Sequence, residues 1–187
     1  ELSVPIGSWK SAIGEVVLKI RGAVLALAYI LSRLALRNVI YKAPETTVKL
    51  FVTTIFDIIR DARDSLLRRS AQVAIGQLSL AGVLSTTVLS NDEWDTIVDK
   101  LKPDAKAESE TAITAIGLLS LSFSKVDHRD PQFTKFLNSL HNLHEIRSPE
   151  THFTIGEALS GAAAGWTSKS MATEFDVDEK APHLATL

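Results

Sequence analysis

The chain has 187 residues, of which 45% are hydrophobic and 22% are charged, a balance typical of a folded protein that buries a sizeable core. A net charge of −2 offers no basic surface for nucleic acid, and zero cysteines exclude disulfide bonds and thiolate metal ligands. Because the chain begins at Glu1 and its single methionine is Met171, we interpret it as an internal piece of a larger protein.

Helical spacing of apolar residues dominates the chain and predicts an all-α fold, since no segment alternates in the manner of a strand. The predicted helices cover residues 8–20, 23–37, 45–63, 65–83, 92–101, 105–123, 131–143 and 149–165. Residues 71–91 carry no charge, but their glutamine, serine and threonine side chains argue against membrane insertion.

Proline and capping residues predict where these helices begin and end. Pro44 and Pro103 mark boundaries, because the residue before a proline avoids the helical conformation. Asp130-Pro131 and Ser148-Pro149 each place a capping side chain before a proline at the first helical position. A capping box is predicted from Ser90 to Glu93.

The helices alternate between bulky residues and small ones, which predicts helical hairpins. Hairpins are expected over 8–37, 45–83, 92–123 and 131–165, and residues 166–187 would begin a further repeat or form a tail. The hairpin at 8–37 is the weakest, because Arg21-Gly22 is a short turn. Together they predict one domain over 1–187: a HEAT- or armadillo-like α-solenoid of stacked antiparallel helix hairpins.

One short apolar frame with a small residue at its centre recurs four times. Ala28, Gly76, Gly117 and Gly156 occupy that centre, at intervals of 48, 41 and 39 residues, close to the roughly 40–47 residues of two-helix repeats. An interior glycine costs a helix about 1 kcal/mol relative to alanine, so three of them in the same frame indicate that helices pack closely there. All four should occupy equivalent positions on successive second helices.

Three side-chain clusters are candidates for chemistry, and each has a simpler explanation. His141, His144, Glu145 and His152 could supply metal ligands, but without a metalloprotease-type HExxH pattern they fit better the polar end of a helix.

The second cluster is acidic and the third is basic. Asp92, Glu93, Asp95 and Asp99 lie at a helix start, with Trp94, Ile97 and Val98 predicted on the buried face. Arg60, Arg63, Arg68 and Arg69 are interleaved with Asp57, Asp61 and Asp64, which predicts local ion pairs across a turn and leaves a protein contact open.

Known catalytic and nucleotide-binding motifs are absent from the sequence. It contains no phosphate loop, no dinucleotide-binding glycine pattern and no nucleophile elbow. We therefore expect no enzyme, no cofactor and no catalytic or metal residue, and the sequence assigns no partner-binding residue. Trp9 and Trp94 are predicted in the core, while Trp166 could be exposed.

Four islands of this sequence, in order, resemble a family of large HEAT-like scaffold proteins associated with the proteasome. They are Gly22 to Arg33, Ala71 to Gly82, Thr111 to Leu119 and His152 to Ser160, of which Phe153-Thr154-Ile155-Gly156-Glu157-Ala158 is the most specific. The resemblance covers roughly residues 22–165, with looser loops between the islands.

The resemblance implies a non-enzymatic adaptor in the cytoplasm and nucleus that bridges the core and regulatory particles of the 26S proteasome. It also implies roles in proteasome assembly quality control and recruitment, but no family contact motif matches numbered residues here. Two alternatives stay open: a HEAT or armadillo segment in nuclear transport or vesicle traffic, and an unrelated all-α enzyme domain.

Overall fold

The computed structural model describes residues 6–84, 91–120, 138–143, 145–146 and 148–177, and all regular secondary structure among them is helical. The fold is therefore all-α. The long helices are α1 (Ile6–Leu36), α2 (Glu45–Asp61), α3 (Ser65–Leu80), α4 (Asn91–Lys106), α5 (Glu110–Leu119) and α7 (Pro149–Val177), and a short 3-10 helix, η1, spans Ile40–Lys42. Residues 138–141 add one helical turn.

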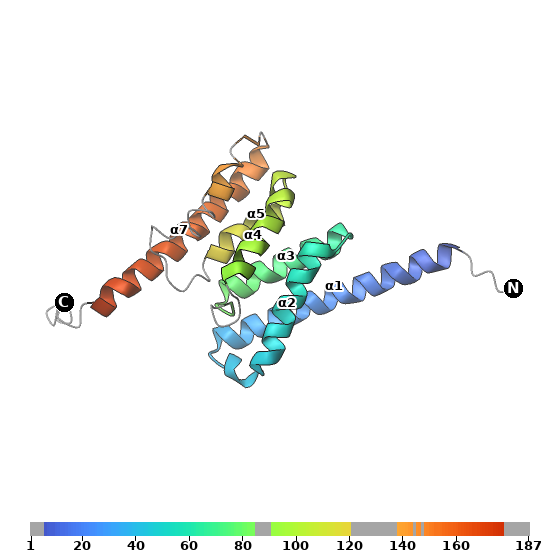
Figure 1. The fold of residues 1–187 in the computed structure, drawn as a ribbon, viewed down its shortest axis with the longest axis horizontal. Coiled ribbons are helices and arrows are strands. Elements are labelled where there is room, and N and C mark those ends of the chain that lie inside the picture. Colours follow the sequence, from blue (N-terminus) through green and yellow to red (C-terminus); the bar gives the residue numbers. More distant parts are fainter. Residues whose placement is uncertain (1–5, 85–90, 121–137, 144, 147, 178–187) are drawn as a thin grey trace.

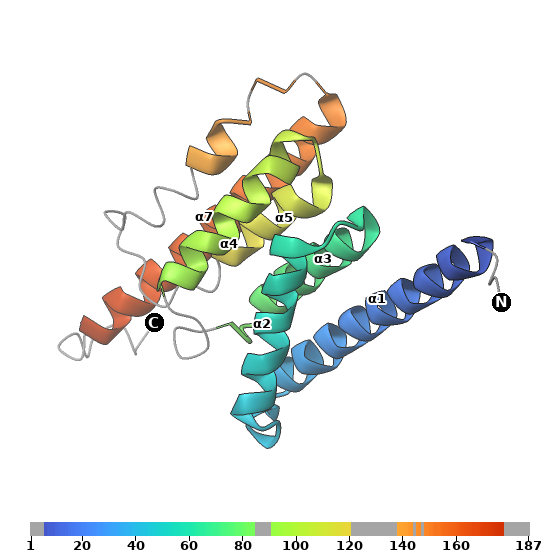
Figure 2. The same ribbon diagram turned by 45° about the vertical axis from the view of Figure 1, so that its right-hand side comes forward.

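The helices pack in two rows that follow the order of the chain (Figure 1 and Figure 2). In one row α1 packs on α3, α3 on α5, and α5 on α7. In the other row α2 packs on α4, and each of these helices also packs on its successor in the chain, α3 and α5 respectively. The first half of α1 projects away from this assembly.

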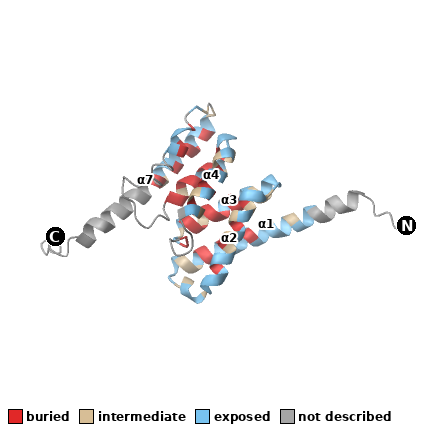
Figure 3. Cartoon of the chain, in the orientation of Figure 1, coloured by how far each residue is buried: buried red, intermediate tan, exposed pale blue. Residues whose placement is uncertain are grey.

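The hydrophobic core runs between the two rows and along the contacts within the longer row (Figure 3). Each helix contributes its apolar stripe at helical spacing, as Val48, Val52, Ile55 and Ile59 do from α2. Trp94 is 2% exposed and is the largest buried side chain among those the structure describes, so its predicted core position is confirmed. Ile97 and Val98 are buried beside it on α4, also as predicted.

The predicted break at Gly22 is wrong, and residues 8–37 do not form a hairpin. One continuous helix, α1, runs through Ile6–Leu36. Gly22 lies on an open part of α1, with no atom near the place of a side chain. A single interior glycine costs a helix about 1 kcal/mol, which the helical residues on both sides offset.

The predicted end of a helix at Pro103 is also wrong. Pro103 is inside α4, which continues to Lys106, so α5 begins at Glu110 instead of residue 105. An interior proline costs about 3 kcal/mol because it cannot donate a helical hydrogen bond. Leu101 and Ala105 on either side are at most 1% exposed, and their burial offsets that cost.

Three helices end instead in a left-handed residue. Asn38 after α1, Gly82 after α3 and Glu108 after α4 have φ of 54°, 72° and 62°. At each end the next amide donates to a carbonyl five residues back, as Val83 does to Leu78 at 2.9 Å. This hydrogen-bond pattern satisfies carbonyls that the helix end leaves open.

The proline boundaries before α2 and α7 are confirmed. Pro44 directly precedes α2, and α7 begins at Pro149 with the Thr151 amide donating to the Ser148 hydroxyl at 3.4 Å. The helix α7 extends to Val177, beyond the predicted end at residue 165. The predictions for Ser90, Asp130-Pro131, residues 131–137 and residues 178–187 lie outside the described part of the chain.

Candidate functional site

A groove lies between α2 and α4. It has a volume of 270 Å³. From α2 it is lined by Thr53, Phe56, Asp57 and Arg60, and from α4 by Asp92, Glu93, Thr96, Ile97 and Lys100. Half-buried Phe56 and buried Ile97 supply apolar surface, and charged side chains of both signs surround it. We call this feature the α2–α4 groove.

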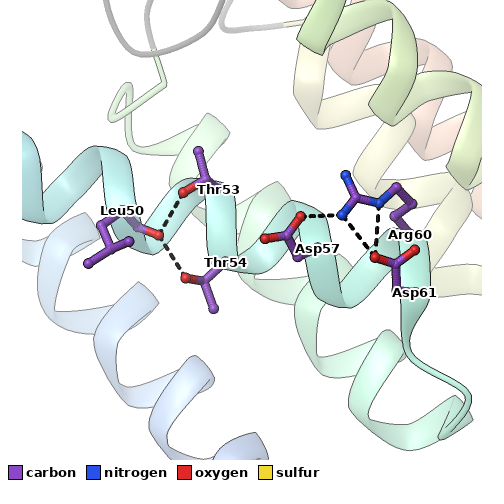
Figure 4. Close-up of polar contacts among 6 residues, drawn as sticks. All are labelled: Leu50, Thr53, Thr54, Asp57, Arg60 and Asp61. Carbon is purple, nitrogen blue, oxygen red and sulfur yellow. Dashed lines mark hydrogen bonds and ion pairs between the residues drawn. The ribbon is translucent and has the colours of Figure 1, made fainter.

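One wall of the α2–α4 groove is fixed by an ion-pair network on α2 (Figure 4). The Arg60 guanidinium donates from Nη2 to Asp57 at 2.6 Å and to Asp61 at 2.8 Å. The hydrogen bond to Arg60 lowers the pKa of Asp61, and the same bond raises the pKa of Arg60. All three side chains are exposed, so the network orients Arg60 while adding little stability.

The two threonines that line the groove, Thr53 and Thr96, are hydrogen-bonded to their own helices, and so is Thr54, which follows Thr53 on α2. The Thr53 and Thr54 hydroxyls both donate to the Leu50 carbonyl, at 2.9 and 2.8 Å. On α4, Thr96 likewise donates to the Asp92 carbonyl at 2.8 Å. These hydroxyls therefore donate to carbonyls of their own helices and not to a neighbouring base.

The acidic cluster at the start of α4 is only partly on the solvent side. Asp92 and Asp99 are exposed, whereas Glu93 and Asp95 are half-buried. Asp92 and Glu93 face the α2–α4 groove, and Asp99 pairs with Lys102 at 2.8 Å. The groove was not predicted, because its residues come from two helices whose polar faces each resemble an ordinary solvated surface.

The predicted arginine cluster is divided between two locations. Arg60 pairs within α2, while Arg68 pairs with Asp104 of α4 at 3.4 Å. Asp64 accepts from the Leu67 amide at 2.7 Å and so caps α3. Local pairing with the interleaved acids is confirmed for Arg60, which pairs with Asp57 and Asp61 within α2. The predicted placement of ion pairs across the turn between α2 and α3 is wrong, because Arg68 pairs with Asp104 of α4 and Asp64 is used as a cap.

A polar joint centred on Gln72, which is 1% exposed, was not predicted from the sequence. The Gln72 amide nitrogen donates to Asp104 at 2.6 Å, and the Thr111 hydroxyl donates to the Gln72 oxygen at 2.6 Å. The joint links α3 with both α4 and α5. A glutamine within an uncharged stretch was the signal, since a buried amide requires partners. Its satisfied bonds make it a structural element and not a reactive one.

The recurring small residues lie on α1, α3, α5 and α7, but they are not equally crowded. A Cβ on Gly117 would lie 2.6 Å from backbone atoms of Ala158 on α7, and one on Gly76 would lie 3.2 Å from the Leu118 side chain. Ala28 is fully buried. A Cβ on Gly156 would meet no atom of another element within 4 Å, so the packing explanation is wrong for Gly156.

The histidine cluster is not assembled as a metal site in the part of the chain that the structure describes. No three His, Asp or Glu side chains among the described residues are placed to hold an ion. His141, Glu145 and His152 are exposed, and His144 lies outside the described residues. The side chains of Trp9 and Trp166 are also outside them, so their predicted positions stay predictions.

None of the helices in the described ranges combines the length and the hydropathy that crossing a bilayer requires. The chain matches no protein-family model, no curated protein and no solved structure.

Proposed function

We propose that this chain is a segment of an α-solenoid scaffold, built of stacked helix hairpins, that binds other proteins and carries no catalytic site. The observation that carries the proposal is the order of contacts: the helices α1, α3, α5 and α7 pack in succession, and α2 and α4 form a parallel second row. Repeats that contact only their neighbours characterise solenoids.

Recurring hydrogen bonds support the same arrangement. The Ser32 hydroxyl on α1 donates to the Gln77 carbonyl on α3, at 3.4 Å. The Ser79 hydroxyl on α3 donates to the Leu118 carbonyl on α5, at 2.7 Å. In both cases the acceptor directly follows the glycine of the next frame, whereas the donor lies four residues after Ala28 in α1 and three residues after Gly76 in α3.

Within this proposal the α2–α4 groove is the partner-binding surface. It fits an apolar side chain placed against Phe56 and Ile97 and followed by a basic side chain near exposed Asp92. Arg60 is already held by two carboxylates and does not compete for that acid. The partner that the sequence resemblance proposes is the 26S proteasome, in its core and regulatory particles, in the cytoplasm and nucleus.

Affinity capture tests this proposal. The tagged protein is recovered from a cell lysate under gentle, ATP-containing conditions, and subunits of both proteasome particles are quantified by mass spectrometry. We expect both sets of subunits with the wild type and a several-fold loss with Asp92→Lys. The control is Glu45→Lys, the same charge change at an exposed first-turn residue of α2 outside the groove.

Each alternative result contradicts a defined part of the proposal. Capture without proteasome subunits overturns the proteasome as partner, and nuclear-transport or vesicle-coat proteins in their place would favour the competing solenoid families. Equal recovery with Asp92→Lys and Glu45→Lys would remove the α2–α4 groove from the binding surface.

A further inference from the structure

The α2–α4 groove has different charges at its two ends. The hydrogen bond from Arg60 lowers the pKa of Asp61, and the positive charge of Lys100 on α4 lowers it further. Lys100 therefore lies at the end of the groove where α2 finishes. Asp92, which also lines the groove, precedes Lys100 by about two turns of α4, or about 12 Å along the helix axis. The Asp92 carboxylate thus lies at the opposite end.

The side chains of Asp92 and Lys100 are available to a ligand. Both are exposed, and the ion pairs among the described residues include neither of them. Half-buried Glu93 is a second carboxylate at the Asp92 end. On the α2 wall, by contrast, Arg60 and Asp57 already neutralise each other at 2.6 Å. Opposite charges are therefore offered at the two ends of the groove.

Apolar surface lies between these charged ends. Asp92, Thr96 and Lys100 form one stripe along α4, and Ile97 belongs to the middle of that stripe. Half-buried Phe56 faces the same hollow from α2. From the start of α4 onward the groove therefore presents an acid, an apolar surface and a base. A complementary ligand presents a base, an apolar group and an acid in that direction.

The walls of the groove favour a helix as the ligand. Extended peptides are usually held by main-chain hydrogen bonds to a strand edge, and both walls here are helices whose main-chain groups are bonded internally. The Thr53 and Thr96 hydroxyls already donate to their own helices. A helix satisfies its own main chain and presents side chains two turns apart on one face, about 10–12 Å from each other, which matches the separation of Asp92 from Lys100.

We propose that the α2–α4 groove binds an amphipathic helix of a protein partner that carries an acidic residue, a large apolar residue about one turn later, and Lys or Arg about two turns later. The acid pairs with Lys100, the apolar side chain packs on Phe56, and the base pairs with Asp92. This helix runs antiparallel to α4, and its acid-before-base order is the one that its own dipole favours. The proposal rests on the function proposed above, in which the groove is the partner-binding surface, and it adds the chemistry and direction of the bound segment.

Selection from a library of displayed peptides tests the proposal. Each peptide is an alanine-rich helix in which only the residues of one face are randomised, and the library is selected for binding to the immobilised full-chain protein. We expect the selected helices to carry an acid about two turns before a base several-fold more often than the reverse order. A large apolar residue should be enriched between them.

Reversing the charge at each end identifies which side chain recognises which residue. Lys100→Glu should abolish the preference for the acid and keep the preference for the base, whereas Asp92→Lys should do the opposite. The matched controls, Lys49→Glu and Glu45→Lys, make the same charge changes at exposed residues of α2 outside the groove. Neither control should change the selected sequences.

The failures are distinguishable from one another. No enriched helix, a reversed charge order, or an order that Lys100→Glu and Asp92→Lys leave unchanged would overturn the inferred ligand. If the selected helices respond to both variants but proteasome subunits are not captured, only the proposed partner is wrong. If capture falls with Asp92→Lys and not with Lys100→Glu, the groove binds its partner and the oriented helix is wrong.

Discussion

Replacing Gly117 by alanine should destabilise the protein, although alanine favours helix. Helix propensity alone would add about 1 kcal/mol to the free energy of unfolding. The new methyl group, however, would lie 2.6 Å from the Cα and the carbonyl oxygen of Ala158 and 2.7 Å from its Cβ. These atoms are backbone or fixed to it, so α5 and α7 must move apart. Overpacking of this kind typically costs about 1–3 kcal/mol.

The net expectation for Gly117→Ala is a loss of about 1–2 kcal/mol, since the steric cost is at the upper end and the propensity gain offsets part of it. The measurement is urea denaturation followed by circular dichroism at the helical band. Gly156→Ala is the matched control: the same change in the same frame, with open space around it. It should stabilise the protein by up to about 1 kcal/mol.

The result that would refute this reasoning is a Gly117→Ala protein as stable as the wild type while Gly156→Ala gains stability. That outcome would mean that the crossing of α5 over α7 is loose and that the shared frame does not reflect packing.

Three further predictions concern the joint, one helix end and the ion-pair network. Gln72→Leu should lower the free energy of unfolding by about 1–3 kcal/mol, because Asp104 loses its hydrogen bond from a buried partner. If the loss is much smaller than the loss measured for Asp104→Ala, the Gln72 joint contributes little to stability. Glu108→Gly should raise the melting temperature, since a left-handed non-glycine residue costs about 1–2 kcal/mol, and an unchanged melting temperature would contradict that strain. For the pair of Arg60 and Asp61, the folded state lowers the pKa of Asp61, so any stabilisation is present above the unfolded pKa and is lost as pH falls through the lowered value. Asp61→Asn should therefore be less stable than wild type at pH 7 and equal to it in strong acid, and a pH-independent difference in denaturation would count against the ion pair as its cause.

The sequence predicted the helices well where apolar spacing and capping residues agree. At α2 and α7 a proline coincides with the start of an apolar stripe, and both helices begin where expected. Gly22 and Pro103 misled the prediction because each is a local penalty of a few kcal/mol at most, whereas burial of neighbours such as Leu101 decides whether the helix continues.

The candidate site was less predictable because it is made by helices that are distant in sequence. Phe56 and Ile97 come from helices separated by a third one, and only the packing of α2 on α4 brings them to one groove. The Gln72 joint is of the same kind, since its partners Asp104 and Thr111 lie on either side of a helix boundary that the sequence placed wrongly.

The serine hydrogen bonds described above also constrain how this sequence can vary. Ser32 and Ser79 donate to main-chain carbonyls, so the hydrogen bond alone does not specify the side chain of the accepting residue, and the two acceptors are as different as Gln77 and Leu118. Leu118 is constrained separately, because its side chain lies against Gly76. Related repeats should therefore be recognised by a small residue followed about one turn later by serine, with no requirement that the acceptor be a polar residue.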